Sequence, residues 1–255
     1  MGINAPRGTQ DFYGPYMDAV LELESTMRGL CEDFGFNQIR TPMFERVELF
    51  QRGVGETTDI VQKEMYTVTD KSRQKREFAL KPEGTAGVVR AYLERKMYAD
   101  TQPTKLYYLT PAFRYEKPQA GRFRQFHQFG VELFGAGGPE ADAEIIAIGY
   151  QMLKRLGIKD VILHINSLGN SDSRKKYNEL LVGFLKENED NLCETCKERM
   201  VKNPLRVLDC KVESCQAVIK DAPLMLDHLS EEDREHYDGV LKLIDEMENP
   251  YEGLL

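Results

Sequence analysis

Residues 113–116 read Phe-Arg-Tyr-Glu, and residues 122–132 read Arg-Phe-Arg-Gln-Phe-His-Gln-Phe-Gly-Val-Glu. Aromatic residues recur through both stretches, which favours strands, and the polar loop between them contains proline and glycine. The pattern therefore predicts a β-hairpin. Because successive side chains on a strand point to opposite faces, Phe126, Gln128 and Glu132 are expected to share one face.

The hairpin is rich in guanidinium groups, which are carried by Arg114, Arg122 and Arg124. Guanidinium is permanently charged and fork-shaped, so it binds phosphate oxygens well. Phe126 offers a flat apolar ring on which a base can stack. These groups suit a nucleoside triphosphate held beside a small polar substrate. On charge alone, however, a solvated surface hairpin with ordinary Arg–Glu pairs is the simpler interpretation.

Outward from the hairpin, helices and short strands mix without strict alternation. Helices are predicted at 17–34, 84–98 and 141–156, and strands at 36–40, 78–80, 105–109, 123–134 and 161–165. This mixture predicts an α+β fold with a largely antiparallel sheet. Polar helices and a cysteine cluster follow Gly169, so we expect two domains, 1–169 and 170–255.

The composition excludes several classes of protein. Hydrophobic residues make up 41% of the 255, with 12 Phe and 12 Tyr, so wholesale disorder is excluded. The net charge of −8 means that any nucleic-acid contact must come from a local basic strip. No apolar run approaches the ~20 residues that span a bilayer. Five cysteines without an export signal predict a cytoplasmic chain with reduced thiols and no membrane partner.

Arg114-x-Glu116, a loop, and Arg122-x-x-x-Phe126 resemble motif 2 of the class II aminoacyl-tRNA synthetases. The whole second arm is most similar to the histidyl-tRNA synthetase family. Other segments agree: Pro-Arg-Gly-Thr-Gln-Asp at 6–11, Arg-Gly-Val-Gly-Glu at 52–56, Leu-Lys-Pro-Glu-Gly-Thr at 80–85, Ile-Asn-Ser at 165–167, and Arg-Thr-Pro at 40–42, which resembles motif 1. The resemblance covers nearly the whole chain.

The resemblance implies an antiparallel sheet flanked by helices, in a homodimer joined through motif 1 near Pro42. It also implies an ATP-binding ligase of protein biosynthesis. In its reaction the carboxylate of histidine attacks the α-phosphate of ATP and releases pyrophosphate. The acyl group then passes to the 3′-terminal ribose of histidine tRNA. ATP would arrive as its Mg²⁺ complex, with the metal bridging the phosphates.

The resemblance further implies which residues hold histidine. Glu83 would pair with the α-amino group in a charge-assisted hydrogen bond, and Gly84 and Thr85 would shape that pocket. Gln128 and Glu132 would bind the rest of the substrate, with Glu132 beside the imidazole. An imidazole donates from one nitrogen and accepts at the other, so a carboxylate can orient it.

A second set of residues is implied for ATP. Arg114 would bind both the histidine carboxylate and the α-phosphate, and it would act catalytically by stabilising the charge that develops there. Glu116 would contact the adenine side, Arg122 would reach the γ-phosphate, and Phe126 would stack on adenine. His127 is more simply a surface residue of the strand than a catalytic base.

The sequence also departs from the family pattern. The Arg-Gly-Leu-Asp-Tyr-Tyr segment, motif 3 and the anticodon-binding domain of the family have no counterpart in this chain, so we expect an incomplete catalytic region. The alternative is a non-catalytic, histidine-binding paralogue similar to the regulatory subunit of the ATP phosphoribosyltransferase system. A regulator has no need of the ATP-binding set, and this set is complete in the sequence, so we favour the ligase.

Four of the five cysteines come late in the chain, as Cys193-x-x-Cys196 and Cys210-x-x-x-x-Cys215. The outline resembles a four-thiolate zinc site, although the second gap is wider than a tight knuckle. In the family this segment is an insertion that contacts the tRNA acceptor region. Two interpretations stay open, a zinc site or reduced thiols in a small helical subdomain.

Overall fold

The computed structural model describes residues 2–55, 58, 60–71, 75–247 and 251–253. The chain divides into two compact units. Unit 1 comprises Met1–Gly137 and Glu144–Lys159, and unit 2 comprises Gly138–Ala143 and Asp160–Leu255. The sequence predicts a boundary near residue 169, whereas the contacts divide the chain at 159–160. The assignment of a catalytic core and an insertion to these parts stays a prediction.

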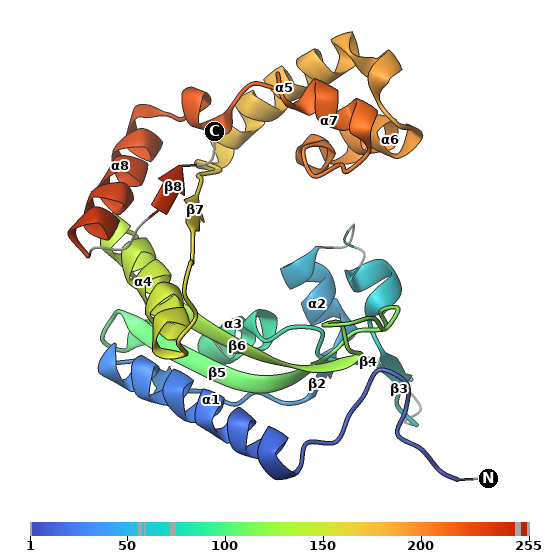
Figure 1. The fold of residues 1–255 in the computed structure, drawn as a ribbon, viewed down its shortest axis with the longest axis vertical. Helices are drawn as coiled ribbons and strands as arrows, with labels where there is room; N and C mark the ends of the chain where they lie inside the picture. Colours follow the sequence, from blue (N-terminus) through green and yellow to red (C-terminus); the bar gives the residue numbers. More distant parts are fainter. Residues whose placement is uncertain (1, 56–57, 59, 72–74, 248–250, 254–255) are drawn as a thin grey trace. The chain divides into compact units, whose positions relative to one another are not determined.

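The predicted hairpin is the centre of unit 1. Strands β5 (Thr104–Phe113) and β6 (Gln125–Phe134) pair antiparallel along their whole length, and β1 (Asn37–Gln38) joins β5 in parallel (Figure 1). Helix α1 (Gly14–Asp33) runs along this sheet. The hairpin is therefore confirmed, but its first arm was misplaced: it covers the separate strand predicted at 105–109 and ends at Phe113, where the predicted arm at 113–116 begins.

A second, smaller sheet completes unit 1. Its strands pair antiparallel in the order β2 (Phe44–Arg46), β4 (Glu77–Leu80), β3 (Thr67–Thr69). The helical elements are α2 (Val47–Val54), a π-helical turn at Ile60–Glu64, α3 (Thr85–Glu94), a 3-10 turn at Met97–Ala99 and α4 (Pro139–Arg155), whose first residues belong to unit 2. The sequence analysis missed β2 and β3, because strands of three residues carry too few alternations to stand out. It also missed the eight-residue helix α2, which is shorter than the window of about 11–18 residues in which helical periodicity is recognised.

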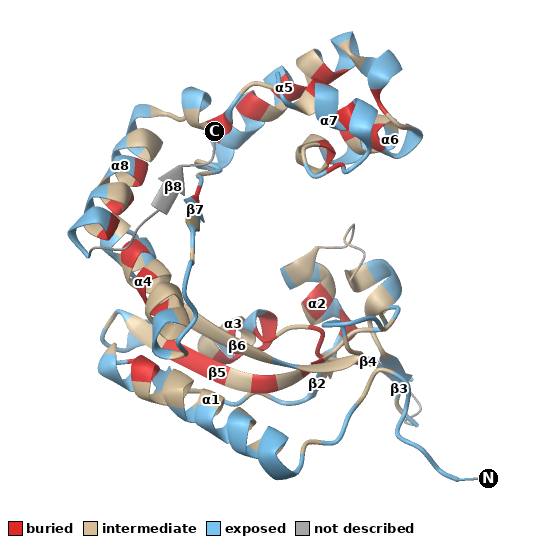
Figure 2. Cartoon of the chain, in the orientation of Figure 1, coloured by how far each residue is buried: buried red, intermediate tan, exposed pale blue. Residues whose placement is uncertain are grey.

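The two faces of the hairpin pack against different partners. On the odd-numbered face, Tyr107 shares an apolar cluster with Leu30 of α1 and Ile148 of α4. On the even-numbered face, Tyr108 shares another with Val88 of α3. Figure 2 shows buried segments, in red, along β5 and α3. One face of β6 is therefore committed to the core, and the other carries the residues expected to bind substrate.

Unit 2 is mainly helical. It contains α5 (Ser171–Glu187), α6 (Glu194–Lys202), α7 (Glu213–Ile219), α8 (Glu231–Glu246), 3-10 turns at Glu189–Asn191, Pro204–Val207 and Met225–His228, and the parallel pair β7 (Leu163–Ile165) and β8 (Tyr251–Gly253). The side chains of Asn170 and Ser230 cap α5 and α8 by accepting backbone N–H bonds, as their sequence positions suggest.

The α+β fold class is confirmed. The two three-stranded sheets lie in unit 1, one mixed and one antiparallel, while the strands of unit 2 are limited to one short parallel pair among the described residues. Within the described parts of the chain, no helix is both long and apolar enough to cross a bilayer.

Candidate active site

Tyr108 is the point at which the hairpin and the loop at 80–85 meet. It lies directly opposite Gly130 in the strand register, and only 4% of it is exposed. A Cβ atom added to Gly130 would lie 2.3 Å from the tyrosine ring, and one added to Gly84 would also lie 2.3 Å from it. Both positions therefore require glycine, because any side chain would overlap the ring.

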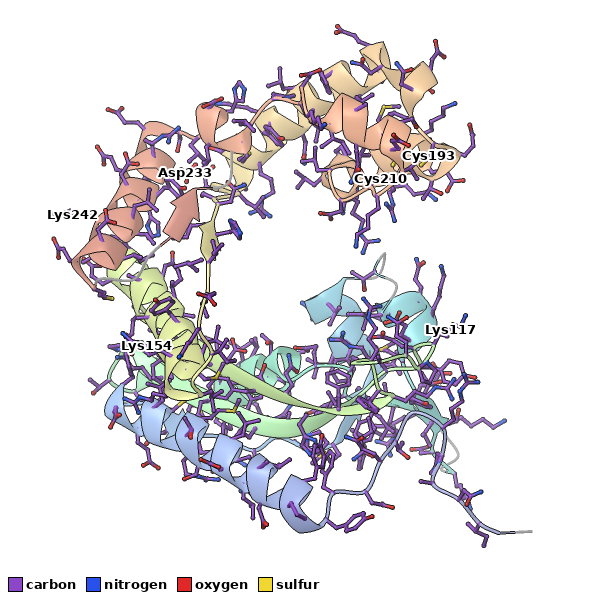
Figure 3. All side chains as sticks on the ribbon, viewed as in Figure 1. Lys117, Lys154, Cys193, Cys210, Asp233 and Lys242 are labelled. Atoms are coloured by element: carbon purple, nitrogen blue, oxygen red, sulfur yellow. The ribbon has the colours of Figure 1, made fainter. Side chains whose placement is uncertain are left out.

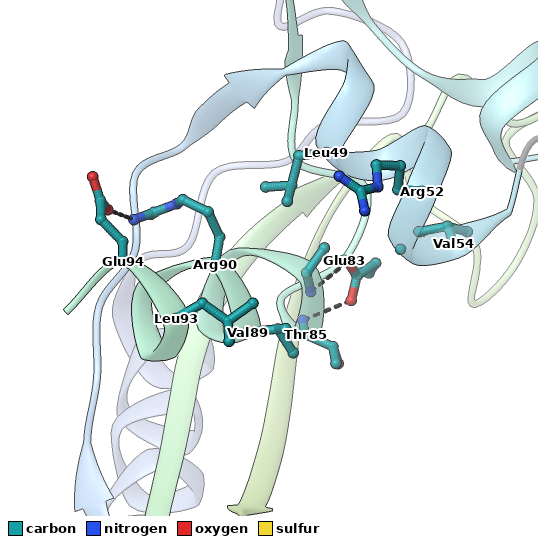
Figure 4. Close-up of a pocket in the computed structure, with 11 residues that line it drawn as sticks. Leu49, Arg52, Val54, Glu83, Thr85, Val89, Arg90, Leu93 and Glu94 are labelled. Carbon is teal, nitrogen blue, oxygen red and sulfur yellow. Dashed lines mark hydrogen bonds and ion pairs between the residues drawn. The ribbon is translucent and has the colours of Figure 1, made fainter. Parts of the chain in front are cut away.

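The loop before α3 is tied down by hydrogen bonds. The Glu83 carboxylate accepts from the backbone N–H of Thr85 at 2.6 Å and of Ala86 at 2.9 Å, so it caps the start of α3 (Figure 4). The Gly84 N–H donates to Oε1 of Gln128 at 2.9 Å. The Thr85 hydroxyl lies 3.3 Å from the Tyr108 hydroxyl. The loop and β6 are thus held in one network.

Arg114 follows β5 directly and joins the same network. Its Nε donates to the Pro82 carbonyl oxygen at 2.9 Å, and its backbone N–H donates to the carbonyl of Arg124 at 2.9 Å. Its guanidinium carbon lies 5.1 Å from the centre of the Phe126 ring. The cation and the ring therefore lie together, next to the Glu83 loop.

Glu132 lies on the same face of β6, opposite Leu106. Burial raises the pKa of its carboxyl group, and the charge of Glu83 raises it further, while the Thr85 hydroxyl lowers it. Burial also raises the pKa of Tyr108, which both carboxylates reinforce. Two carboxylates that share a half-buried site favour a cationic or hydrogen-bond-donating ligand.

The residues predicted to bind ATP lie around the turn of the hairpin. The Glu116 carboxylate lies 3.9 Å from Nη1 of Arg114 and 3.6 Å from Nη1 of Arg122. The Arg122 side chain is 65% exposed, so it is accessible to the phosphate that it is predicted to contact. Arg124 instead stacks over the Tyr115 ring at 4.1 Å and donates from Nε to the Glu116 carbonyl. Arg124 therefore braces the loop.

The opening segment of the chain reaches this region as well. The Gly8 carbonyl accepts from the backbone N–H of Arg124 at 2.7 Å, and a Cβ on Gly8 would lie 2.8 Å from the Arg124 side chain. This contact gives the Pro-Arg-Gly-Thr string a physical role beside the turn of the hairpin. Residue 56, the last of the string at 52–56, lies outside the described residues.

The sequence analysis missed two buried polar residues near the site. Tyr108 becomes recognisable only once the strand register is known, because it lies opposite Gly130 and its ring fills the space that the glycine leaves. Lys81 gives no comparable signal; it is 2% exposed, its ammonium lies 3.5 Å from the Thr41 carbonyl, and burial lowers its pKa. His127 lies on the opposite face from Gln128, with its ring 5.3 Å from that of Phe12.

A cavity of about 850 Å³ lies between α2 and α3 (Figure 4). Glu83 and Thr85 reach it, and its other walls combine aliphatic side chains of the two helices with the charged side chains of Arg52, Arg90 and Glu94. Arg114, Gln128 and Glu132 do not line it. This groove between α2 and α3 therefore adjoins the predicted histidine site and shares only Glu83 and Thr85 with the residues predicted to bind histidine.

The four late cysteines come together in unit 2, where Figure 3 labels two of them. The cysteine cluster consists of Cys193, Cys196, Cys210 and Cys215, whose Sγ atoms all lie within 4.8 Å of one another. All five cysteines of the chain are free thiols.

Comparison with known proteins gives this geometry a context. Residues 8–173 match the family model described as histidyl-tRNA synthetase. The histidine–tRNA ligase of Halothermothrix orenii is 53% identical over 245 residues, which are 96% of this chain and 58% of that protein. The ligase of Caldanaerobacter subterraneus subsp. tengcongensis is 54% identical over 247 residues, 97% of this chain and 59% of that protein.

A solved structure agrees with the sequence relatives. Apo histidyl-tRNA synthetase of S. aureus superposes with a TM-score of 0.77 at 37% identity, covering 99% of this chain and 57% of that one. The chain thus spans somewhat under three fifths of the length of these relatives. The matching family model, the identity above one half and the shared fold agree with the hairpin and loop described above, and the chain belongs to the histidyl-tRNA synthetase family.

Proposed function

We propose that this chain serves a histidine–tRNA ligase, which activates histidine with ATP and transfers it to the 3′ end of histidine tRNA. One observation carries the proposal: Gly84 bonds to Gln128 while Arg114 bonds to Pro82, so the loop and both arms of the hairpin form one site. The curated relatives bear the name histidine–tRNA ligase, and the chain spans less than two thirds of their length.

Histidine recognition is assigned to the even-numbered face of β6 and the loop. A carboxylate has about four acceptor positions, so Glu83 can cap α3 and still accept from the α-ammonium group. Gln128 offers its oxygen to Gly84, which orients its NH₂ group for the substrate. Glu132 loses solvation in the site, where the Thr85 hydroxyl is its hydrogen-bond partner, and an imidazole N–H would supply a further hydrogen bond to its carboxylate.

Activation is assigned to the arginines. Arg114 would hold the histidine carboxylate against the α-phosphate, so that the carboxylate oxygen attacks phosphorus as the bond to the β-phosphate breaks and pyrophosphate leaves. Arg122 and Glu116 would line the triphosphate and adenine positions, and Phe126 would stack on the base. Mg²⁺ would enter bound to the phosphates of ATP. The tRNA ribose hydroxyl would then attack the acyl carbon and release AMP.

Association into a homodimer is proposed through the segment at Pro42. Met43 is 43% exposed and Phe44 is 57% exposed, so this segment presents apolar surface next to the proline. The reduced thiols fit a cytoplasmic protein. Sedimentation tests the dimer, and a monomer at every concentration would contradict it.

Histidine-dependent ATP–pyrophosphate exchange tests the function. It should be measured on this chain and on a protein of the relatives' full length that contains it. Arg114→Ala is expected to reduce exchange in the active form by about 100- to 1,000-fold, since it removes transition-state charge stabilisation. Arg155→Ala is the matched control, because this exposed arginine pairs with Asp33 outside the site. An unchanged rate in Arg114→Ala would remove Arg114 from its role, and histidine binding without exchange in either form would favour the regulatory alternative.

A further inference from the structure

The sulfur atoms of the cysteine cluster lie close together, although the four cysteines come from different elements. Cys193 is the residue that precedes α6, and Cys196 lies in the first turn of that helix. Cys210 follows the 3-10 turn at Pro204–Val207, and Cys215 lies in α7. Four thiols from three short segments meet within 4.8 Å. Ordinary burial of apolar cysteines does not require their sulfur atoms to converge in this way.

The separation of the sulfur atoms fits a single tetrahedral ion. With a Zn–S bond of about 2.3 Å, the edge of a four-sulfur tetrahedron is about 3.8 Å. The Sγ atoms of Cys193 and Cys210 are 4.0 Å apart, and no pair in the cluster exceeds 4.8 Å. The 4.0 Å separation is about twice the bond length of a disulfide. A shift of less than about one ångström per sulfur therefore closes the tetrahedron.

The backbone around the cluster suits negatively charged sulfur. The N–H of Cys193 donates to Sγ of Cys215 at 3.2 Å, a hydrogen bond of the kind that stabilises metal-bound thiolates. Cys193 also stands at the N-terminal end of α6, where the helix dipole favours negative charge. Three of the thiols are buried and Cys193 is partly exposed, which leaves one side of the cluster accessible to an entering ion.

The surrounding core is small. The buried cluster of this region includes three of the cysteines themselves, and it otherwise consists of residues such as Leu181, Leu185 and Val207. The helices that form it lie within 171–228, and segments of this size commonly need a metal or a crosslink to stay folded. Because the cysteines belong to this core, a metal bound to them would stabilise it directly.

We propose that the cysteine cluster binds one structural Zn²⁺ ion through all four thiolates. On binding, each thiol loses its proton to solvent and each sulfur forms a bond to the metal, giving a closed site with a net charge of −2. A closed four-sulfur shell leaves no position for substrate, so the role of the ion is to hold α6, α7 and the turn between them together. Iron also binds in tetrahedral four-sulfur sites, so bound iron is the alternative that the metal analysis must distinguish from zinc.

The metal content of the untagged chain, purified with reductant and without chelator, tests the proposal. Elemental analysis should find about one zinc per chain. Cys210→Ser should lower this value at least about fivefold, whereas Cys31→Ala should leave it unchanged, because Cys31 lies in the core of unit 1. Less than about one tenth of a zinc per chain in the unaltered protein, or iron in its place, would overturn the proposal.

A second measurement covers the case in which Cys210→Ser does not fold. The unaltered chain is stripped of metal by a chelator and titrated with Co²⁺. One equivalent should produce the absorption of tetrahedral cobalt bound to thiolates, and one equivalent of Zn²⁺ should abolish it. No cobalt absorption would contradict the site. Neither measurement depends on aminoacylation, so the metal site and the enzymatic function stand or fall separately.

Discussion

The hairpin site of unit 1 and the cysteine cluster of unit 2 bring distant residues together in different ways. At the hairpin, a ten-residue strand pairing fixes every position, and hydrogen bonds then attach the loop at 80–85 to it. At the cysteine cluster, short helices and turns place four thiols close together without any sheet. A sheet can preorganise a site by itself, whereas we expect the small helical core of unit 2 to depend on the metal that its thiolates bind.

The difference has a consequence for stability. The hairpin site carries a cost in stability, because it buries the Glu132 carboxyl group beside the charge of Glu83. Strand pairing and the cores on both faces of the hairpin offset that cost. The cluster instead contributes stability when its ligand is bound. Metal removal and single substitutions separate these two cases.

Removal of zinc should have the largest effect, and it should be confined to unit 2. Structural zinc contributes about 10–16 kcal/mol in small zinc-binding peptides, as much as the whole stability of a typical domain. After chelation we expect hydrogen-exchange protection to fall sharply in α5, α6 and α7 and to persist in β5 and β6. Equal loss of protection in both regions, or in neither, would contradict the comparison.

Gly130→Ala should destabilise unit 1 by about 1–3 kcal/mol, because its methyl group must displace Tyr108. Gly29→Ala is the matched control: Gly29 lies within α1 and has no atom within 4 Å of its Cβ position, so alanine should stabilise by about 0.5–1 kcal/mol. Calorimetry measures both variants. Adding Tyr108→Ala to Gly130→Ala should cost less than the sum of the single changes, and additive costs would show that the two residues do not compete for space.

Asp233→Asn should destabilise unit 2 by a smaller amount that depends on pH. The Asp233 carboxylate accepts from the hydroxyls of Ser173 at 2.6 Å and Ser230 at 2.8 Å, and these bonds lower its pKa. Because its pKa is lower in the folded chain, the ionised carboxylate stabilises the fold at pH values above its unfolded pKa of about 3.9. This stability is lost as the pH falls through the folded pKa.

The deficit of Asp233→Asn in melting temperature should therefore be present at neutral pH and shrink below about pH 4. Asp238→Asn, which changes an exposed carboxylate on the same helix, is the control and should show little change at either pH. A deficit that stays constant with pH would mean that shape, and not charge, holds this contact.

Glu132→Gln should have the smallest effect on stability. Unlike Asp233→Asn, it should raise the melting temperature. Burial and Glu83 raise the pKa of Glu132, so the fold favours the protonated carboxyl group. This contribution to stability is fully present below the unfolded pKa of about 4.3, and it is lost as the pH rises through the folded pKa. The glutamine variant should melt slightly higher than the unaltered chain at about pH 8, and the gain should disappear near about pH 4. The same variant should bind histidine more weakly. A gain in melting temperature that is independent of pH would contradict burial of the charge as its cause.

The sequence predicted the hairpin site better than its surroundings. Two-residue alternation correctly placed Gln128 and Glu132 on one face, because an extended strand leaves no other choice. The helix predicted at 84–98 ends at Glu94, since Lys96 adopts a left-handed conformation that hydrophobic periodicity does not report. The role of Tyr108 depends on its pairing with Gly130 across the two strands, and such pairing is a tertiary property.

The cysteine spacing predicted a group of four but not its geometry. Cys193 and Cys196 are close because they share one helical turn, which any sequence-based argument can state. The approach of Cys210 and Cys215 depends on how α7 packs in the core, and local pattern does not determine that packing. The substrate roles of Glu83, Arg114 and the other site residues rest on the family resemblance and stay predictions until a ligand is seen.

A crystal structure of the chain with bound L-histidine tests the central claim most directly. We predict the α-ammonium group within about 2.6–3.2 Å of the Glu83 carboxylate, the carboxylate of the ligand beside the Arg114 guanidinium, and the imidazole beside Glu132. Histidine found instead in the groove between α2 and α3, or touching none of these three residues, would contradict the account.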